Sequence, residues 1–264
     1  MRYLITGATG FVGSHLAEAL AGDRARMKAL VRPTSDVRLL EELGIELAGG
    51  GLGSEEGLLE ATTNVDVVLH LAALTRARNE EEFREANETG TRRLLQAAAD
   101  SEACKRFVYV SSMAAVGPSR GGVAVKPGDN PRPLTAYGRT KLGGEEACLQ
   151  FEGDLEVVIL RPPAVYGPGD QDLLTFFKLA RWGILPVPTG GERPLQMIHV
   201  SDLVRAIRLA APPGAGTGTH HVAEAKAHPW EGVLDLMAEA VGVRGRKVPL
   251  PQMLLKAAGA ASGG

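Results

Sequence analysis

The stretch "TGATGFVG", residues 6–13, decides how this chain folds. It places Gly7, Gly10 and Gly13 between an apolar run typical of a β-strand and a pattern typical of an α-helix. Glycines at this spacing allow a tight turn, a close approach of the backbone to a pyrophosphate, and close packing of the helix on the strand. Backbone N–H groups at the start of the helix then bind the phosphates. The stretch predicts a dinucleotide-binding turn, with an ordinary glycine-rich turn as the alternative.

The rest of the chain alternates short apolar runs with longer helical patterns. The predicted strands cover residues 2–6, 26–31, 44–49, 65–72, 106–112 and 155–162, and the predicted helices cover residues 12–22, 80–100 and 135–151. The nearly continuous apolar run at 65–72 is typical of a central parallel strand that is covered on both faces. Strands that alternate with helices predict an α/β fold, a doubly wound parallel sheet of the Rossmann type.

The composition changes in residues 162–170, which are punctuated by proline and glycine. We therefore predict an NAD(P)-binding Rossmann domain at residues 1–161 and a small C-terminal substrate-binding lobe at residues 162–264. Residues 197–212 read as a strand followed by a helix and are expected to return to the first domain. Such a lobe would lie over the carboxyl ends of the strands, where ligands bind in this architecture.

The composition also narrows the classes of function. The chain has 264 residues, of which 44% are hydrophobic and 23% are charged, as in an ordinary globular protein. A formal net charge of −2 argues against a nucleic-acid partner. No apolar run approaches the length of about 20 residues that spans a bilayer. The amino terminus lacks the apolar core of a signal peptide, and Cys104 and Cys148 make no disulfide framework, so we expect a cytoplasmic protein.

The end of the second predicted strand indicates which dinucleotide is bound. An acidic residue about 20 positions after the glycines would bind the ribose 2′-hydroxyl of NAD. This chain instead has "ALVRPTSD", residues 29–36, with Arg32 followed by Ser35. An arginine at that place pairs with a 2′-phosphate through a forked contact, which favours NADP(H). The alternatives are a solvated Arg32, and NAD(H) with Asp36 as a ribose ligand.

Tyr137 and Lys141 in "YGRTK", residues 137–141, lie four positions apart and share one face of a predicted helix. The strand before this helix ends in Ser111 and Ser112, at the edge of the sheet where catalytic groups gather. A serine hydroxyl would hold a substrate oxygen, and Tyr137 would give or take its proton. Lys141 would lower the pKa of the phenol from about 10 and hold the nicotinamide ribose. The pattern predicts a site that reduces carbonyls or oxidises alcohols, with two ordinary helix-surface residues as the alternative.

Seven motifs occur along the chain in a recognisable order. They are "TGATGFVG" (6–13), "HLAA" (70–73), "NETGTRRLLQAA" (87–98), "YVSS" (109–112), "YGRTK" (137–141), "LRPPAVYGPGD" (160–170) and "IHVSDLVRAI" (198–207). In this order and spacing they resemble the extended short-chain dehydrogenase/reductases, also called the NAD-dependent epimerase/dehydratase superfamily. The resemblance covers nearly the whole chain.

The resemblance implies the residues of the site. Ser112 lies 25 positions before Tyr137, as the serine of the family does, so the implied catalytic residues are Ser112, Tyr137 and Lys141. The implied cofactor contacts are Gly7, Thr9, Gly10, Phe11, Val12, Gly13, Arg32, Leu71, Ala72, Ala73, Tyr137, Lys141 and Pro162. The resemblance also implies a homodimer, in which the helices predicted at 80–100 and 135–151 pair across a two-fold axis.

Other conspicuous residues are expected to be structural. Asn87 is expected to tie its helix to a strand, as in the family, and His70 is expected to pack at the end of a buried strand. The adjacent histidines at positions 220 and 221 lack further ligands at metal spacing, so no metal site is predicted. Trp182 and Trp230 are expected to pack the small lobe, and for Trp182 the alternative is contact with the substrate.

Departures from the family pattern narrow the substrate. Members that act on nucleotide sugars carry an asparagine where this chain has Ala164 and an arginine where it has Leu195, although Arg193 lies nearby. Without that amide and guanidinium, a nucleotide diphosphate would lack charge-assisted contacts. Relatives also carry an acidic residue against the adenine amine, where Gly50 and Gly51 stand here. Adenine contacts are therefore expected to come from the backbone.

The stretches "RPPAVYGPGDQ" and "VSSMAAVGP", with the apolar lobe, resemble the branch of 3β-hydroxysteroid dehydrogenase-like and dihydroflavonol-reductase-like enzymes. We therefore predict an NADP(H)-dependent oxidoreductase that interconverts a ketone and a secondary alcohol on a largely apolar small molecule. The alternatives are a nucleotide-sugar epimerase or dehydratase with tightly held NAD, and a non-catalytic dinucleotide-sensing protein. The last helical pattern breaks off where relatives continue, so the lobe is expected to be truncated at its C-terminus.

Overall fold

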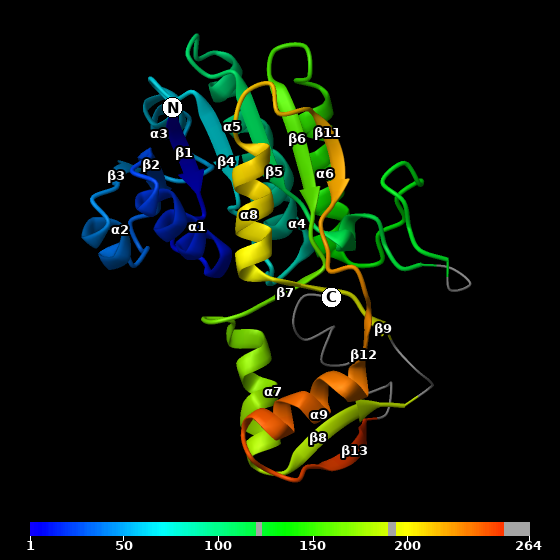
Figure 1. The fold of residues 1–264 in the computed structure, drawn as a ribbon. Coiled ribbons are helices and arrows are strands. Elements are labelled where there is room, and N and C mark those ends of the chain that lie inside the picture. Colours follow the sequence, from blue (N-terminus) through cyan, green and yellow to red (C-terminus); the bar gives the residue numbers. More distant parts are fainter. Residues whose placement is uncertain (120–122, 190–193, 251–264) are drawn as a thin grey trace.

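A seven-stranded sheet forms the larger part of the computed structural model, which describes residues 1–119, 123–189 and 194–250 (Figure 1). The strand order is β11-β6-β5-β4-β1-β2-β3, and every neighbouring pair is parallel. The strands are β1 (Arg2–Thr6), β2 (Arg26–Val31), β3 (Glu46–Gly49), β4 (Val67–His70), β5 (Arg106–Val110), β6 (Glu156–Arg161) and β11 (Gly218–His221). The order of the first six is that of a dinucleotide-binding sheet, which confirms the predicted fold class.

Helices cover both faces of this sheet. The helices on one face are α1 (Phe11–Gly22) and α8 (Val200–Ala210), with α2 (Arg38–Glu42) beside α1. The helices on the other face are α3 (Glu55–Thr62), α5 (Gly90–Ala99) and α6 (Ala136–Leu149). Two separate apolar cores result, and the strand residues between them are fully buried, as Val67 to Leu69 show. This double cover explains why β4 reads as a continuous apolar run.

The helix predicted at 80–100 is interrupted by a π turn. It consists of α4 (Glu80–Arg84), the π-helical turn η1 (Glu85–Thr89) and α5. The wider turn carries Asn87, whose side chain is fully buried. Turns of this kind occur frequently at functional sites, because they redirect one side chain within an otherwise regular helix.

The strand β11 was not predicted. Residues Gly218–His221 lie in the part of the chain that the sequence assigned to the lobe, but they pair with β6 and extend the large sheet. The stretch "GTHH" is polar and short, so its own sequence does not favour a strand. It becomes one because it pairs with β6. Helix α8, within the segment expected to return to the sheet, packs on α1.

A second group of elements lies beyond the carboxyl ends of the strands, toward which the arrows of β6 and β11 point in Figure 1. Its helices and strands are α7 (Gln171–Arg181), β8 (Ile184–Pro188), α9 (Trp230–Ala240) and β13 (Arg246–Leu250). They share a small core around Leu185, Leu234 and Met237. Two short ladders connect this lobe to the sheet, namely β7 (Ala164–Tyr166) with β10 (Met197–His199), and β9 (Pro194–Leu195) with β12 (His228–Pro229).

Two sequence expectations fall outside the described residues, the substitute arginine Arg193 and the C-terminal pattern from residue 251 onward. In the parts of the chain that are described, none of the helices combines the length and apolarity needed to cross a membrane.

Candidate active site

The turn between β1 and α1 has the geometry that its glycines predict. Gly7 adopts φ +73°, and a Cβ there would lie 2.7 Å from the backbone nitrogen of Ala72. A Cβ on Gly13 would lie 2.0 Å from the carbonyl oxygen of Gly7. Both distances are shorter than side chains tolerate, so glycine is required at both positions. Gly10 closes the turn by donating its N–H to Gly7 O at 3.0 Å.

The first turn of α1 is suited to an anion. Its N-cap is Gly10, which supplies no side-chain cap, and the first turn contains no acidic residue. Within the described part of the chain, the N–H groups that follow, at Phe11 and Val12, have no side-chain acceptor, while the helix dipole favours negative charge at this end. With the close backbone approach at Gly7, these features fit a dinucleotide pyrophosphate. Thr9 lies exposed in the same turn.

A buried hydrogen-bond relay holds the loop after β4 against the glycine turn. Ala72 N donates to Thr6 Oγ1 at 3.2 Å, and Thr6 Oγ1 lies 2.6 Å from His70 Nδ1. His70 Nε2 lies 2.9 Å from Thr91 Oγ1, which donates to the carbonyl oxygen of Asn87 at 2.8 Å. Burial, with Lys141 as the lesser cause, lowers the pKa of His70 to about 3, so the ring is neutral. His70 therefore acts on this loop through Thr6 and Ala72 N, in the structural role that was expected of it.

Asn87 connects the same loop to the helix that carries Tyr137. Its Oδ1 accepts from Leu74 N at 2.7 Å, and its Nδ2 donates to Leu74 O at 3.0 Å. Nδ2 also donates to Thr140 Oγ1 at 3.2 Å, and Thr140 Oγ1 donates to Tyr137 O at 3.1 Å. The structural role predicted for Asn87 thus extends to the tyrosine.

Arg32 follows β2 directly and is exposed. A Cβ on Gly51 would lie 3.5 Å from Arg32 Cγ, so the arginine stem runs past the glycines at the end of β3. Asp36, the alternative ribose ligand, is held instead by the Arg38 guanidinium at 2.9 and 2.5 Å. These bonds lower the pKa of Asp36 to about 2. Among the residues that the structure describes, Arg32 has no ion-pair partner.

Tyr137 and Ser112 come together at the carboxyl end of β5. Ser112 caps a single 3₁₀ turn, η2 (Met113–Ala115), because its Oγ accepts from Ala114 N at 3.1 Å. The same hydroxyl lies close enough to the Tyr137 phenol to affect its pKa. Burial raises the pKa of the Tyr137 phenol, and the nearby Ser112 hydroxyl opposes this rise only in part. The phenol therefore carries its proton at neutral pH.

Lys141 lies one turn further along α6 and is 1% exposed. Its Nζ donates to Val110 O at 2.9 Å and lies 4.1 Å from the centre of the Tyr109 ring. Burial lowers the pKa of Lys141 to about 7, against the opposing effects of Cys148 and Glu145. The lowering of the Tyr137 pKa that was expected from Lys141 is therefore not seen in this structure, because the ammonium is directed to the strand end.

Pro162 adjoins these residues from the next strand. It is buried, and its carbonyl oxygen accepts from Met113 N at 2.8 Å, directly after Ser112. The structure thus brings the ends of β5 and β6 to the same place as the start of α6. Arg32 lies at the far end of the same sheet edge, beyond β1, as the strand order requires.

A buried network behind the site was not predicted. Arg161 donates Nε and Nη2 to the Glu145 carboxylate, Ser111 Oγ donates to the same carboxylate, and Arg161 Nη1 donates to Pro127 O at 3.2 Å. The sequence does contain a signal for Glu145, because it lies four positions after Lys141 and so continues the same helix face.

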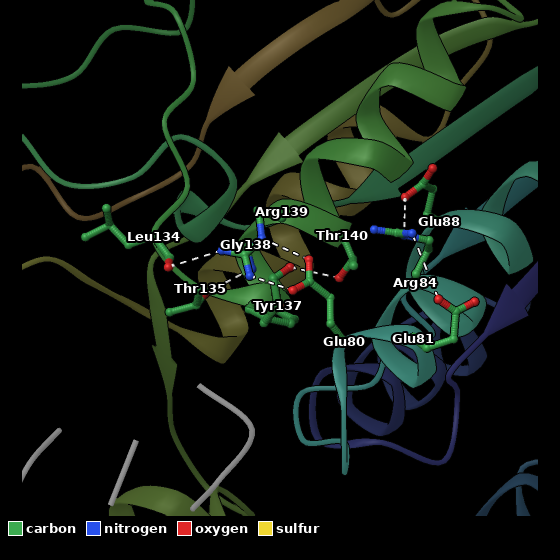
Figure 2. A network of polar contacts seen from close by, with 10 residues as sticks. All are labelled: Glu80, Glu81, Arg84, Glu88, Leu134, Thr135, Tyr137, Gly138, Arg139 and Thr140. Carbon is green, nitrogen blue, oxygen red and sulfur yellow. Dashed lines mark hydrogen bonds and ion pairs between the residues drawn. The ribbon is translucent and has the colours of Figure 1, made fainter. Parts of the chain in front are cut away.

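The outer start of α6 is fixed to α4 by a second network, shown in Figure 2. Arg139 forks onto the carboxylate of Glu80 at 3.0 and 2.8 Å and also donates to Leu134 O at 3.3 Å. Thr135 caps the helix by accepting from Gly138 N at 3.0 Å. These contacts flank Tyr137 on the solvent side, opposite the buried network of Glu145.

Comparison with known proteins gives consistent matches. The family described as the NAD dependent epimerase/dehydratase family matches residues 3–222. Ceramide reductase of Caulobacter vibrioides (strain NA1000 / CB15N) is 34% identical over 258 residues, which cover 97% of this chain and 75% of that protein. The 4-hydroxy-2-methyl-3-oxo-4-farnesyl-3,4-dihydroquinoline-1-oxide ketoreductase of Stigmatella aurantiaca is 30% identical over 269 residues, with coverage of 98% and 78%. Among solved structures, MoeE5 in complex with UDP-glucuronic acid and NAD has a TM-score of 0.79 at 30% identity, covering 95% of this chain and 86% of that chain.

Proposed function

Because this chain belongs to the NAD-dependent epimerase/dehydratase family, as its motifs predicted, we propose that it is an NADP(H)-dependent oxidoreductase interconverting a ketone and a secondary alcohol. The observation that carries the proposal is the placement of the Ser112 hydroxyl near the Tyr137 phenol at the end of β5, with Lys141 one turn away on α6. A protonated phenol beside a second hydroxyl is suited to bind a carbonyl oxygen and protonate it.

The roles of the three residues follow from their contacts. The Ser112 hydroxyl, which lies near the Tyr137 phenol, would hold the substrate oxygen between the two side chains. Tyr137 donates its proton to that oxygen during reduction and removes the alcohol proton during oxidation. A bound nicotinamide supplies or accepts the hydride. Lys141 holds the carbonyl of Val110 and thereby the strand end that presents Ser112, and we propose that it also binds the nicotinamide ribose.

The preference for NADP(H) rests on Arg32. This exposed guanidinium stands where β2 ends, free of ion pairs within the described residues, while Asp36 is occupied by Arg38. The 2′-phosphate of NADP(H) would pair with the Arg32 guanidinium. The 2′-hydroxyl of NAD(H) would need the Asp36 carboxylate, which is already bonded to Arg38. The remaining proposed contacts are those of the glycine turn, the loop 71–73 and Pro162.

The substrate is proposed to be largely apolar. Ala164 and Leu195 offer neither an amide nor a guanidinium to a nucleotide diphosphate, and they lie on β7 and β9 between the sheet and the lobe. Two relatives are named for reactions on ceramide and on a farnesylated quinolone-type ring, which agrees with an apolar substrate here. We propose that the lobe, residues 162–264 apart from α8 and β11, binds this substrate.

The test is a panel of ketones, including long-chain and polycyclic ones, with NADPH and NADH as alternative reductants. We expect turnover with an apolar ketone and NADPH, and weaker binding of NADH. The absence of turnover across the panel, with UDP-sugars converted instead, would overturn the proposal.

A nucleotide-sugar epimerase is the second candidate, because the similar structure of MoeE5 holds UDP-glucuronic acid and NAD. Such an enzyme retains its cofactor through the whole cycle. The purified protein should therefore be denatured and any released nicotinamide identified. Near-stoichiometric NAD⁺ would favour the epimerase, and an empty site that binds NADPH reversibly would favour the reductase.

We also propose a homodimer in which the helical segments 80–100 (α4, η1 and α5) and 135–151 (α6) of two copies pair across a two-fold axis. Mass determination in solution tests it, and a monomer at micromolar concentration would refute it.

A further inference from the structure

Two neighbouring turns form the end of the lobe that lies farthest from the large sheet (Figure 1). One turn joins α7 to β8 and the other joins α9 to β13. Arg246 N donates to Gly183 O at 2.7 Å, and the parallel ladder pairs Arg246 with Ile184. We call residues 178–184 and 243–246 the lobe tip.

Trp182 projects from the lobe tip with 77% of its surface exposed. The expectation that it packs the lobe is wrong, because α7 directs other side chains, including Phe176, into the lobe core. Trp230 does pack there, with its ring 5.1 Å from Phe176 and its Nε1 donating to Pro186 O at 3.0 Å. Ile184 adds a partly exposed apolar side chain beside Trp182, at 38%. A large exposed indole, with an apolar ring and a polar N–H, is suited to contact with another surface.

The lobe tip also carries four cations. Lys178, Arg181, Arg244 and Arg246 are all exposed, and within residues 1–119, 123–189 and 194–250 none of the four has an ion-pair partner. The contrast is Lys247, which is paired with Glu231 and Asp235 at 2.9 and 3.1 Å. Glu239, in the last turn of α9, is the exposed carboxylate nearest along the chain. The lobe tip is therefore basic on a protein whose formal net charge is −2.

We propose that the lobe tip docks on an anionic lipid surface. Trp182 would enter the interfacial region, where its apolar ring and N–H are both satisfied, and the four cations would face the lipid phosphates. A second copy of the tip is a poor partner, because four cations would face four cations. Docking would also bring the lobe to the membrane in which an apolar substrate dissolves. Access to a membrane-dissolved substrate rests on the proposed function. The docking itself is inferred only from the exposed Trp182 and the cations of the lobe tip.

The first experiment is sedimentation with vesicles of phosphatidylcholine alone or mixed with phosphatidylglycerol. We expect binding to the mixed vesicles, weakened by salt. The double variant Arg181→Gln/Arg244→Gln should lose more than tenfold in binding, since each cation near an anionic surface contributes about fivefold. The matched control is Arg24→Gln/Arg26→Gln, which removes the same charge at the opposite end of the sheet and should bind as the wild type does.

The second experiment uses tryptophan emission, because the chain has two tryptophans. Trp230→Phe leaves Trp182 alone, and its emission should shift to the blue when mixed vesicles are added. Trp182→Phe leaves the packed Trp230, whose emission should stay unchanged.

Three outcomes would overturn the proposal: no binding to mixed vesicles, equal losses in the Arg181/Arg244 and Arg24/Arg26 variants, or no shift of the Trp182 emission. A dimer that Trp182→Ala converts to a monomer would assign the lobe tip to a second copy instead. None of these measurements contains a ketone or a cofactor, so their failure would leave the proposed reaction standing.

Discussion

Arg161 donates its guanidinium fork to the buried carboxylate of Glu145, with Nε–Oε1 at 2.9 Å and Nη2–Oε2 at 2.6 Å. Arg161 ends β6 and directly precedes Pro162, while Glu145 lies two turns after Tyr137 on α6. The ion pair therefore fixes the distance between the strand end and the helix that together form the candidate site. Neither residue needs to touch the substrate for this effect.

Glu145→Ala should lower the free energy of unfolding by about 3–5 kcal/mol, because it leaves the Arg161 guanidinium buried without its counter-charge. The control is Asp23→Ala, which breaks an exposed pair with Arg208 and should cost less than about 1 kcal/mol. Urea unfolding measures both values. An equal decrease in the free energy of unfolding in the two variants would show that the buried ion pair does not stabilise the fold more than an exposed one does.

Tyr137→Phe should lower kcat by about 10²- to 10⁴-fold, because the ring stays in place while the proton donor is lost. The Kd for NADPH should change little. Tyr166→Phe is the control, since that phenol is bonded to Glu224 in the lobe at 2.8 Å and lies outside the proposed chemistry. Steady-state kinetics with fluorescence titration of NADPH distinguish the two variants, and full activity of Tyr137→Phe would remove it from the mechanism.

Stability should depend on pH through Lys141. Burial lowers its pKa from 10.5 to about 7, so between these values the folded protein binds fewer protons at this site than the unfolded chain does. The free energy of unfolding contributed by this lysine therefore rises with pH above 7 and is at its lowest below 7. Lys141→Met should remove this slope between pH 7 and 8, below the range where thiols and phenols titrate. If the free energy of unfolding rose equally with pH in the wild type and in Lys141→Met, Lys141 would not be the source of the pH dependence.

Arg32→Ala should weaken NADPH binding by about 10- to 100-fold, the effect of losing a hydrogen bond to a charged group, and should leave NADH binding nearly unchanged. Arg26→Ala serves as the control, because Arg26 is exposed at the opposite end of β2 from Arg32. Titration of both nucleotides against each variant gives the result. A similar loss for NADPH and NADH would mean that Arg32 does not contact a 2′-phosphate.

Gly13→Ala should abolish dinucleotide binding, because the new Cβ would lie 2.0 Å from Gly7 O and force the turn open. Gly22→Ala, in the same helix, has no heavy atom within 4 Å of the new Cβ and should be neutral or stabilising by up to about 1 kcal/mol. Nucleotide titration and thermal unfolding compare the two. Retained binding in Gly13→Ala would show that the turn can relax.

Much of the fold could be predicted from local pattern. The six strands from β1 to β6 are apolar runs that alternate with helices. In these segments the local sequence pattern favours the same secondary structure that the packing of the sheet requires. The turn at Gly7 could also be predicted, because its backbone requires a residue without a side chain. Helical spacing places Tyr137 and Lys141 on one helix face, whereas Ser112 was singled out by the resemblance to the family. The roles of all three residues remain predictions.

What the sequence did not predict depends on contacts between distant segments. The polar strand β11 forms because it pairs with β6. The hydrogen-bond relay through His70 joins residues of β1, β4 and α5, which are far apart in the sequence. The direction of the Lys141 ammonium was also missed, since spacing places a residue on a helix face but does not choose its acceptor. The exposure of Trp182 reversed the usual expectation for a tryptophan in an apolar lobe.

The place of β11 has a consequence for synthesis on the ribosome. The first six strands are complete once residue 161 has been made, yet one face of the sheet still lacks α8 and its edge at β6 is open until residue 221 emerges. About sixty further residues must therefore be translated, which takes several seconds at about 5–20 residues per second. During that interval the nascent chain exposes an apolar face and a free strand edge, and this is the stage at which chaperone binding should matter most.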